Sequence, residues 1–196
     1  MSRGDEWPDA DSRAEASANA SRPLIVRCHR EPMSEPLVRP AVLDDAEAIA
    51  VVHHTSWVET YSDLLPAEHW ETDTVERRAQ RWQERLSDDA AGYPSVAVVD
   101  QLVVGFAIAG PTRKKQDVPP PVRADELWSL YVLGEHHGTG ISGLLLDTVL
   151  PPDRPAELWV AGVNPRARRF YEKHGFIPDG AGLTDSLGFA LIRMVR

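Results

Sequence analysis

The chain has 196 residues, of which 42% are hydrophobic and 26% are charged, and its formal net charge is −9. This length and balance fit one globular domain, and an acidic chain without a basic patch argues against binding to nucleic acid. The single cysteine, Cys28, excludes an intrachain disulfide, and no apolar run is long enough for a signal peptide or a membrane span, so we expect a cytoplasmic protein with no membrane partner.

The first 35 residues differ in composition from the rest of the chain. Residues 1–35 are rich in Ala, Ser, Asp, Glu, Arg and Pro and show little hydrophobic periodicity, which is typical of a disordered leader. Met33 also resembles a second start point, which leaves open whether residues 1–32 belong to the native protein. We expect the folded domain at residues 36–196.

From residue 36 onward, the hydrophobic spacing predicts alternating strands and helices. Asp44 is the expected cap of the first helix, Pro66 the start of the second, and Asn164-Pro165 the start of the last. A Pro-rich loop is expected at 110–125. The predicted strands are 37–42, 95–99, 102–109, 126–133, 157–161 and 187–194, and the third helix is 138–150. The order is β-α-α-β-β-β-α-β-α-β, a single mixed α/β domain.

A glycine-rich turn between a predicted strand and a predicted helix carries the strongest chemical signal. The N–H groups of the first helical turn lack internal partners, and the helix dipole favours anions there. Gly138 and Gly140 carry no side chains, so a pyrophosphate can approach the backbone closely. The turn therefore predicts a phosphate cradle, formed by His137, Gly138, Thr139, Gly140, Ile141, Ser142 and Gly143.

Two other interpretations of this turn remain open. The glycines spell G-x-G-x-x-G, the dinucleotide fingerprint, but too few residues follow Gly143 for further βαβ units. The acidic residue that should follow about 20 positions later is also absent, since that region reads Ala161-Gly-Val-Asn164. Alternatively, the turn is structural and binds no ligand.

Two segments resemble the motifs of the GNAT (Gcn5-related N-acetyltransferase) superfamily. The first runs from Leu130-Tyr131-Val132 through Gly138-x-Gly140 to Leu144-Leu145, and the second from Asn164 through Ala167 and Phe170-Tyr171 to Gly175-Phe176. The element order from about residue 36 to the end is similar too. This resemblance implies the GNAT fold, with a central, mostly antiparallel sheet flanked by helices. It also implies acetyl-CoA as co-substrate and no metal.

The resemblance implies a role for each matched residue. A primary amine of a small molecule or a peptide N-terminus would attack the thioester directly. The backbone of Leu130, Tyr131 and Val132 would polarise the carbonyl, and Asn164 would contact the cofactor arm as well as cap its helix. Tyr171 would be the general acid for the leaving thiolate, although by residue type it also reads as a core aromatic beside Phe170.

Residues outside these motifs supply the candidates for the acceptor side. Glu126 is a candidate base, with a solvated strand-end residue as the alternative. Trp57, Glu59 and Tyr61 lie where the family builds its acceptor pocket, although Trp57 also suits a core position. Adjacent histidines at 53–54 and 136–137 lack the i, i+4 spacing of metal ligands, so we expect no metal site.

The sequence also departs from the family pattern. Glu135 stands where the phosphate motif has Gln or Arg, His137 stands where a basic residue usually precedes the glycine, and Ser142 replaces a common glycine. The changes at Glu135 and His137 predict a weaker or pH-sensitive cofactor site, whereas Ser142 adds a hydroxyl donor near the phosphates. They leave room for a non-catalytic acetyl-CoA-binding or sensing module. A toxin-type aminoacyl-tRNA acetyltransferase is a further alternative, which the acidic charge disfavours. The sequence determines neither the identity of the acceptor amine nor whether the protein forms a homodimer.

Overall fold

A computed structural model describes residues 34–88, 92–114 and 118–196. The predicted leader therefore lies almost entirely outside the described residues, together with Cys28. Among the described residues, no helix has the length and apolar character needed to cross a bilayer.

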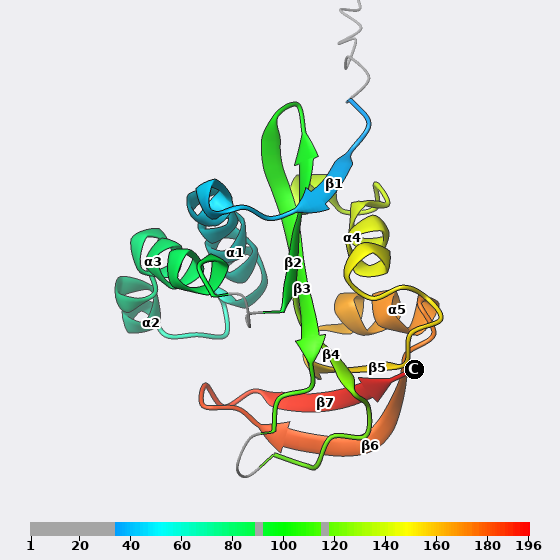
Figure 1. Ribbon diagram of the computed structural model, residues 1–196. Helices are drawn as coiled ribbons and strands as arrows, with labels where there is room; N and C mark the ends of the chain where they lie inside the picture. The colour runs from blue at the N-terminus through cyan, green and yellow to red at the C-terminus, as the bar shows by residue number, and fades with distance from the viewer. Residues whose placement is uncertain (1–33, 89–91, 115–117) are drawn as a thin grey trace, which may run out of the picture. The chain divides into compact units, whose positions relative to one another are not determined.

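The described residues form one seven-stranded sheet with the order β1-β2-β3-β4-β5-β7-β6 (Figure 1). Only β4 and β5 pair in parallel, and the other neighbours are antiparallel. The strands are β1 Leu37–Pro40, β2 Tyr93–Val99, β3 Leu102–Pro111, β4 Asp125–Val132, β5 Ala156–Ala161, β6 Ile177–Thr184 and β7 Ala190–Val195. The expected mixed and mostly antiparallel architecture is confirmed.

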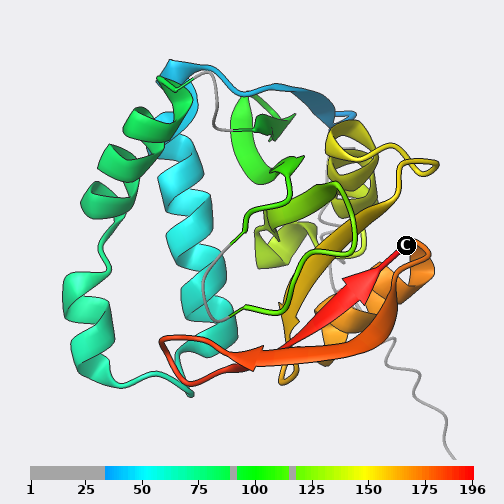
Figure 2. The ribbon, with the colours of Figure 1, turned by 60° about the horizontal axis from the view of Figure 1, so that its bottom comes forward.

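Helices cover both faces of this sheet (Figures 1 and 2). One face carries α1 Ala46–Tyr61, α2 Ala67–Thr72 and α3 Val75–Leu86, and the other carries α4 Ile141–Val149 and α5 Pro165–Lys173. Two short 3-10 helices, η1 Leu43–Asp45 and η2 Gly134–His136, precede α1 and α4. Each face buries its own apolar cluster, one around Ile49 and Phe106 and one around Leu145 and Phe176.

The two central parallel strands, β4 and β5, are paired over only part of their length. β4 pairs with β5 only from Asp125 to Leu127, and no further β4–β5 pair is found in the described chain. The β3–β4 register also shifts between Ile108 and Ala109, so Trp128 is an extra residue on β4. Beyond Leu127 the two strands therefore diverge, and the β4 backbone that faces β5 is left without a sheet partner.

Several predicted details differ from the structure. The second predicted helix is two helices, because Thr74 begins α3 by accepting a hydrogen bond from the Arg77 N–H at 3.4 Å. Asp45 rather than Asp44 binds the backbone before α1, since its carboxylate accepts from the Val42 N–H at 2.8 Å. β6 was not predicted at all. The predicted hairpin is confirmed, with Asp100 and Gln101 at positive φ in its two-residue turn.

Candidate functional site

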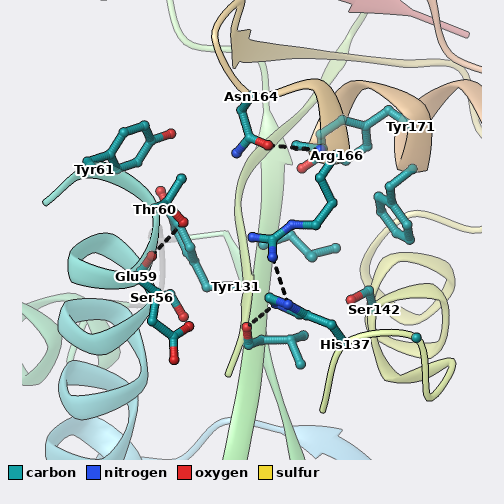
Figure 3. A pocket seen from close by; sticks show the side chains of 15 residues that line it. Ser56, Glu59, Thr60, Tyr61, Tyr131, His137, Ser142, Asn164, Arg166 and Tyr171 are labelled. Carbon is teal, nitrogen blue, oxygen red and sulfur yellow. Dashed lines mark hydrogen bonds between the residues drawn. The ribbon is translucent and has the colours of Figure 1, made fainter. Parts of the chain in front are cut away.

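A cavity of about 180 Å³ lies where β4 leaves β5 (Figure 3). Its walls come from the end of α1, from β4, from the glycine turn before α4 and from α5. A smaller cavity of about 100 Å³ continues it into the gap between β4 and β5. Both are lined by Tyr61, Leu130, Tyr131, Asn164, Ala167 and Tyr171.

The glycine turn contributes Gly138 and Ser142 to the wall of this cavity. Gly138 and Gly140 have φ values of 79° and 91°, which L-residues rarely adopt, and a Cβ on either would meet no atom within 4 Å. The N–H groups of Gly138, Gly140, Ile141 and Ser142 have no acceptor within the described residues. With the dipole of α4 behind them, these donors suit an anionic group such as a phosphate.

His137 and Arg166 close one side of the cavity. The His137 Nε2 lies 2.9 Å from the Val132 carbonyl oxygen, and its Nδ1 lies 2.7 Å from Nη1 of Arg166 (Figure 3). A guanidinium only donates, so Nδ1 accepts and Nε2 carries the proton. His137 is therefore neutral in this arrangement, and Arg166 supplies the positive charge. The contact between Arg166 and His137 was not predicted from the sequence.

Tyr171 faces the cavity from α5 (Figure 3). Its side chain is 8% exposed, and its hydroxyl has no hydrogen-bond partner among the described residues. Burial raises the pKa of the phenol, so it keeps its proton throughout the neutral range. The ring also packs edge-on against Phe170 at 5.2 Å, so Tyr171 is a core aromatic with a free hydroxyl at a cavity wall.

Residues of α1 form the opposite wall. Glu59 is the only acidic side chain among the described residues that line the larger cavity, and its Oε2 accepts from the Gly134 N–H at 3.1 Å. The hydroxyl of Ser56 is buried there and has no hydrogen-bond partner among the described residues. Burial raises the pKa of Tyr61, which lies across from Asn164. Asn164 caps α5, with its Oδ1 accepting from the Ala167 N–H at 3.0 Å.

Two predicted site residues lie elsewhere. Trp57 does not line the cavity; its Nε1 donates to the Tyr131 hydroxyl at 2.9 Å and so fixes that ring, whose burial raises its pKa to about 12. Glu126 is 5% exposed and lines neither cavity. Its carboxylate accepts from Nη2 of Arg113 at 2.9 Å and from the Arg113 backbone N–H at 3.1 Å, so in this structure Glu126 is held in an ion pair.

At three positions of the predicted cradle, the side chain or the space left by its absence serves packing within the protein. Thr139 donates its hydroxyl to the His136 carbonyl at 2.7 Å, and the side chain of Ile141 is buried in the core. Gly143 leaves room for His174, because a Cβ there would lie 3.3 Å from its Nε2. Within the described ranges, no group of three or more His, Cys, Asp or Glu side chains is arranged to hold a metal ion.

Comparison with known proteins gives a family match and several relatives. The family model described as "Acetyltransferase (GNAT) family" matches residues 50–176. An uncharacterized N-acetyltransferase of Bacillus subtilis, YuaI, is 30% identical over 56% of this chain and 59% of its own length. A probable N-acetyltransferase of Mycobacterium tuberculosis, Rv2775, is 26% identical over 75% of this chain and 83% of its own length.

Solved structures share the fold at lower identity. The PaiA N-acetyltransferase of Thermoplasma acidophilum, crystallised with coenzyme A, has a TM-score of 0.59 at 19% identity, covering 81% of this chain and 98% of its own. A structure from Corynebacterium glutamicum, described as histone acetyltransferase HPA2 and related acetyltransferase, has a TM-score of 0.61 at 21% identity, covering 82% and 94%.

Proposed function

The chain belongs to the acetyltransferase (GNAT) family, and we propose that it transfers an acetyl group from acetyl-CoA to a primary amine of a small molecule or a peptide N-terminus. One observation carries the proposal. A single cavity is lined by Gly138 and Ser142 of the glycine turn and by Tyr171, and neither the two N–H groups nor the phenol has a hydrogen-bond partner among the described residues. The N–H groups suit a pyrophosphate and the phenol suits a leaving sulfur.

The residues present fit acetyl-CoA. The free N–H groups of Gly138, Gly140, Ile141 and Ser142 would hold the pyrophosphate. The Ser142 hydroxyl and the Arg166 guanidinium lie on the wall of the same cavity. The open edge of β4 and the side-chain amide of Asn164 would hold the pantetheine arm. One structural relative is a complex with coenzyme A, which supports the same ligand class here.

When bound, acetyl-CoA supplies an activated thioester, and the chain supplies orientation and protons. The β4 backbone that faces the gap would polarise the thioester carbonyl and stabilise the developing oxyanion. As the amine nitrogen bonds to that carbon and the carbon–sulfur bond breaks, Tyr171 would give its proton to the sulfur. The proton that the new amide nitrogen then loses would return to the phenolate through water. Glu59 would attract the ammonium form of the acceptor and take its proton through water.

Calorimetric titration with acetyl-CoA, with NADH as control, tests the ligand. We expect acetyl-CoA alone to bind, because the turn lies in a GNAT cavity rather than in a series of βαβ units. Binding of NADH alone, or of neither ligand, contradicts the proposal. Thiol release with a panel of amines then tests the chemistry. Binding without any transfer would identify a non-catalytic acetyl-CoA-binding module instead.

A further inference from the structure

A second cavity, of about 160 Å³, lies on the α1–α3 side of β4. Four arginines and two tryptophans account for most of its wall: Arg78, Arg81, Arg85, Arg113, Trp82 and Trp128. No acidic side chain lines it among the described residues. A concave site of this composition is unusual in a chain whose net charge is −9.

Two of the four arginines have no acidic partner in the described part of the chain. Arg78 pairs with Asp73, and Arg113 pairs with Glu126. Neither Arg81 nor Arg85 forms an ion pair within residues 34–88, 92–114 and 118–196. Burial, followed by the charge of Arg113, lowers the pKa of Arg85. The cavity therefore holds a surplus of positive charge.

The tryptophans fix the geometry of these cations. The guanidinium carbons of Arg113 and Arg85 lie 4.6 and 5.8 Å from the centre of the Trp128 ring. Gly110 leaves space for that ring, since a Cβ there would come within 2.7 Å of it. The Trp128 Nε1–H is buried and has no acceptor among the described residues. Such an orphaned donor is costly unless a ligand or water accepts from it.

His53 adds another donor. Its Nδ1 accepts from Nε1 of Trp82 at 3.4 Å, so Nε2 carries the proton. Burial, together with the charges of Arg78, Arg85 and Arg81, lowers the pKa of His53 to about 2, which keeps the ring neutral. The polar groups of the wall are thus mostly donors, which complements an anion with several acceptor oxygens.

This cationic cavity adjoins the transfer site. Trp128 and Ser129 line both the cationic cavity and the cavity in the β4–β5 gap, where Tyr171 lies. The His53 ring also packs against Tyr131, a wall residue of the larger cavity, with ring centres 4.8 Å apart. The cationic cavity is therefore separated from the transfer site only by residues that line both or that pack against one another.

We propose that the cationic cavity binds the anionic group, a carboxylate or a phosphate, of a small acceptor whose primary amine is acetylated near Tyr171. The identity of the acceptor rests on the proposed transfer function, whereas anion binding does not. With Glu59 on the amine side and Arg85 on the anion side, the two cavities complement an acceptor that carries both charges.

Binding without chemistry is the first test. Calorimetry would measure glutarate and inorganic phosphate against the wild type, Arg85→Gln, Arg81→Gln and the control Arg77→Gln. Arg77 lies on the same helix but lines neither cavity, and among the described residues its guanidinium binds only the Thr72 carbonyl. We expect one of the two anions to bind, with affinity reduced roughly tenfold or more by Arg85→Gln or Arg81→Gln and unchanged by Arg77→Gln.

The better of the two ligands distinguishes a carboxylate from a phosphate. If neither anion binds, or if Arg77→Gln weakens binding as much as the cavity variants do, the cationic cavity is not an anion site. Thermal unfolding of each variant checks that it folds, and the exposed Arg81 provides a second variant if Arg85→Gln does not fold.

Acetylation of matched amines is the second test. γ-Aminobutyrate and 3-aminopropylphosphonate carry an anion, and butylamine does not. We expect kcat/KM at least roughly tenfold higher for one anionic acceptor than for butylamine, with this preference lost in Arg85→Gln. Equal rates for all three acceptors overturn the inference and leave the transfer function standing. Anion binding without acetylation of any amine overturns the transfer function alone.

Discussion

The Tyr171 hydroxyl has no role in packing that the described structure shows. Replacing Tyr171 with Phe keeps the ring and its contacts with Phe170 and Phe176. If the phenol protonates the leaving sulfur, Tyr171→Phe lowers kcat by roughly 10²- to 10⁴-fold, with little change in acetyl-CoA binding. Steady-state thiol release and calorimetry measure the two quantities.

The pH profile of kcat gives a second view of Tyr171. Burial raises the pKa of the phenol above its usual value of about 10, so the acid form persists throughout the neutral and mildly alkaline range. We expect no decline of kcat from this group up to at least that value. Loss of activity between pH 7 and 9 that disappears in Tyr171→Phe would contradict this assignment.

Substitution of Glu126 and of Glu59 distinguishes a carboxylate that stabilises the fold from one that acts on the acceptor amine. Glu126→Gln removes the charge that holds Arg113, so we expect it to lower the free energy of unfolding by about 1–3 kcal/mol while most of kcat remains. Glu59→Gln alters the cavity wall instead, so we expect it to lower kcat/KM for the amine with little effect on stability. Denaturant unfolding and steady-state kinetics on both variants measure these effects. If Glu126 were the base, Glu126→Gln would lower kcat strongly, whereas Glu59→Gln would leave kcat/KM for the amine nearly unchanged.

Sequence reasoning could not assign these side-chain partners. Glu126 and Arg113 lie 13 positions apart across a Pro-rich loop, and only the pairing of β3 with β4 brings them together. Arg166 and His137 lie 29 positions apart on different elements. Residue type and local spacing predict helices and turns, but they contain no information on where a long, flexible arginine is directed.

At the glycine turn, strain can be separated from ligand binding. Gly140 and Gly180 have the same φ of 91°, and a Cβ on either would meet nothing within 4 Å. Gly140→Ala and Gly180→Ala should therefore both lower stability by about 1–2 kcal/mol. Only Gly140→Ala should also weaken acetyl-CoA binding, since Gly180 lies in β6, away from both cavities. Equal binding by both variants would exclude the turn as the phosphate cradle.

The start of α1 should show a defined pH dependence. Hydrogen bonding to Arg39 lowers the pKa of Asp45, which also accepts from the Val42 N–H. A carboxyl group with a lowered pKa in the folded state stabilises the fold above its unfolded pKa of about 3.9, and this contribution is lost as pH falls through the folded value.

We therefore expect Asp45→Asn to lower the free energy of unfolding by roughly 1–3 kcal/mol at pH 7. The difference from the wild type should shrink below about pH 4. Asp44→Asn is the matched control, because Asp44 has no recorded side-chain partner among the described residues. Urea unfolding at several pH values measures both, and a difference that stays constant down to pH 2 would rule out the ion pair as its source.

Secondary structure was predictable where apolar residues recur regularly. α4 and the hairpin of β2 and β3 show such patterns, and both were predicted to within a few residues. β6 was missed because it is largely exposed and contains Pro178, Gly180 and Gly182, which weaken any strand pattern. Its place in the sheet comes from pairing with β7, a tertiary contact that no local signal contains.

One apolar cluster covers each face of the sheet. Phe106 is fully buried on the side of α1 and α3, and Phe176 on the side of α4 and α5. β3 and β4 contribute residues to both clusters, with Ala107 and Leu127 in one and Phe106 and Tyr131 in the other. Loss of either cluster therefore exposes one face of the strands that line the cavities.

Unfolding should accordingly be a single transition for both faces. Phe106→Ala and Phe176→Ala should each lower the free energy of unfolding by about 3–5 kcal/mol, because each leaves a cavity in a close-packed core. We expect fluorescence and circular dichroism to give coincident urea transitions in both variants, with an unchanged dependence on urea. Separate transitions for the two probes, or a reduced dependence on urea in only one variant, would mean that the two faces fold independently. The walls of the cavities would then belong to two parts of the protein that unfold separately.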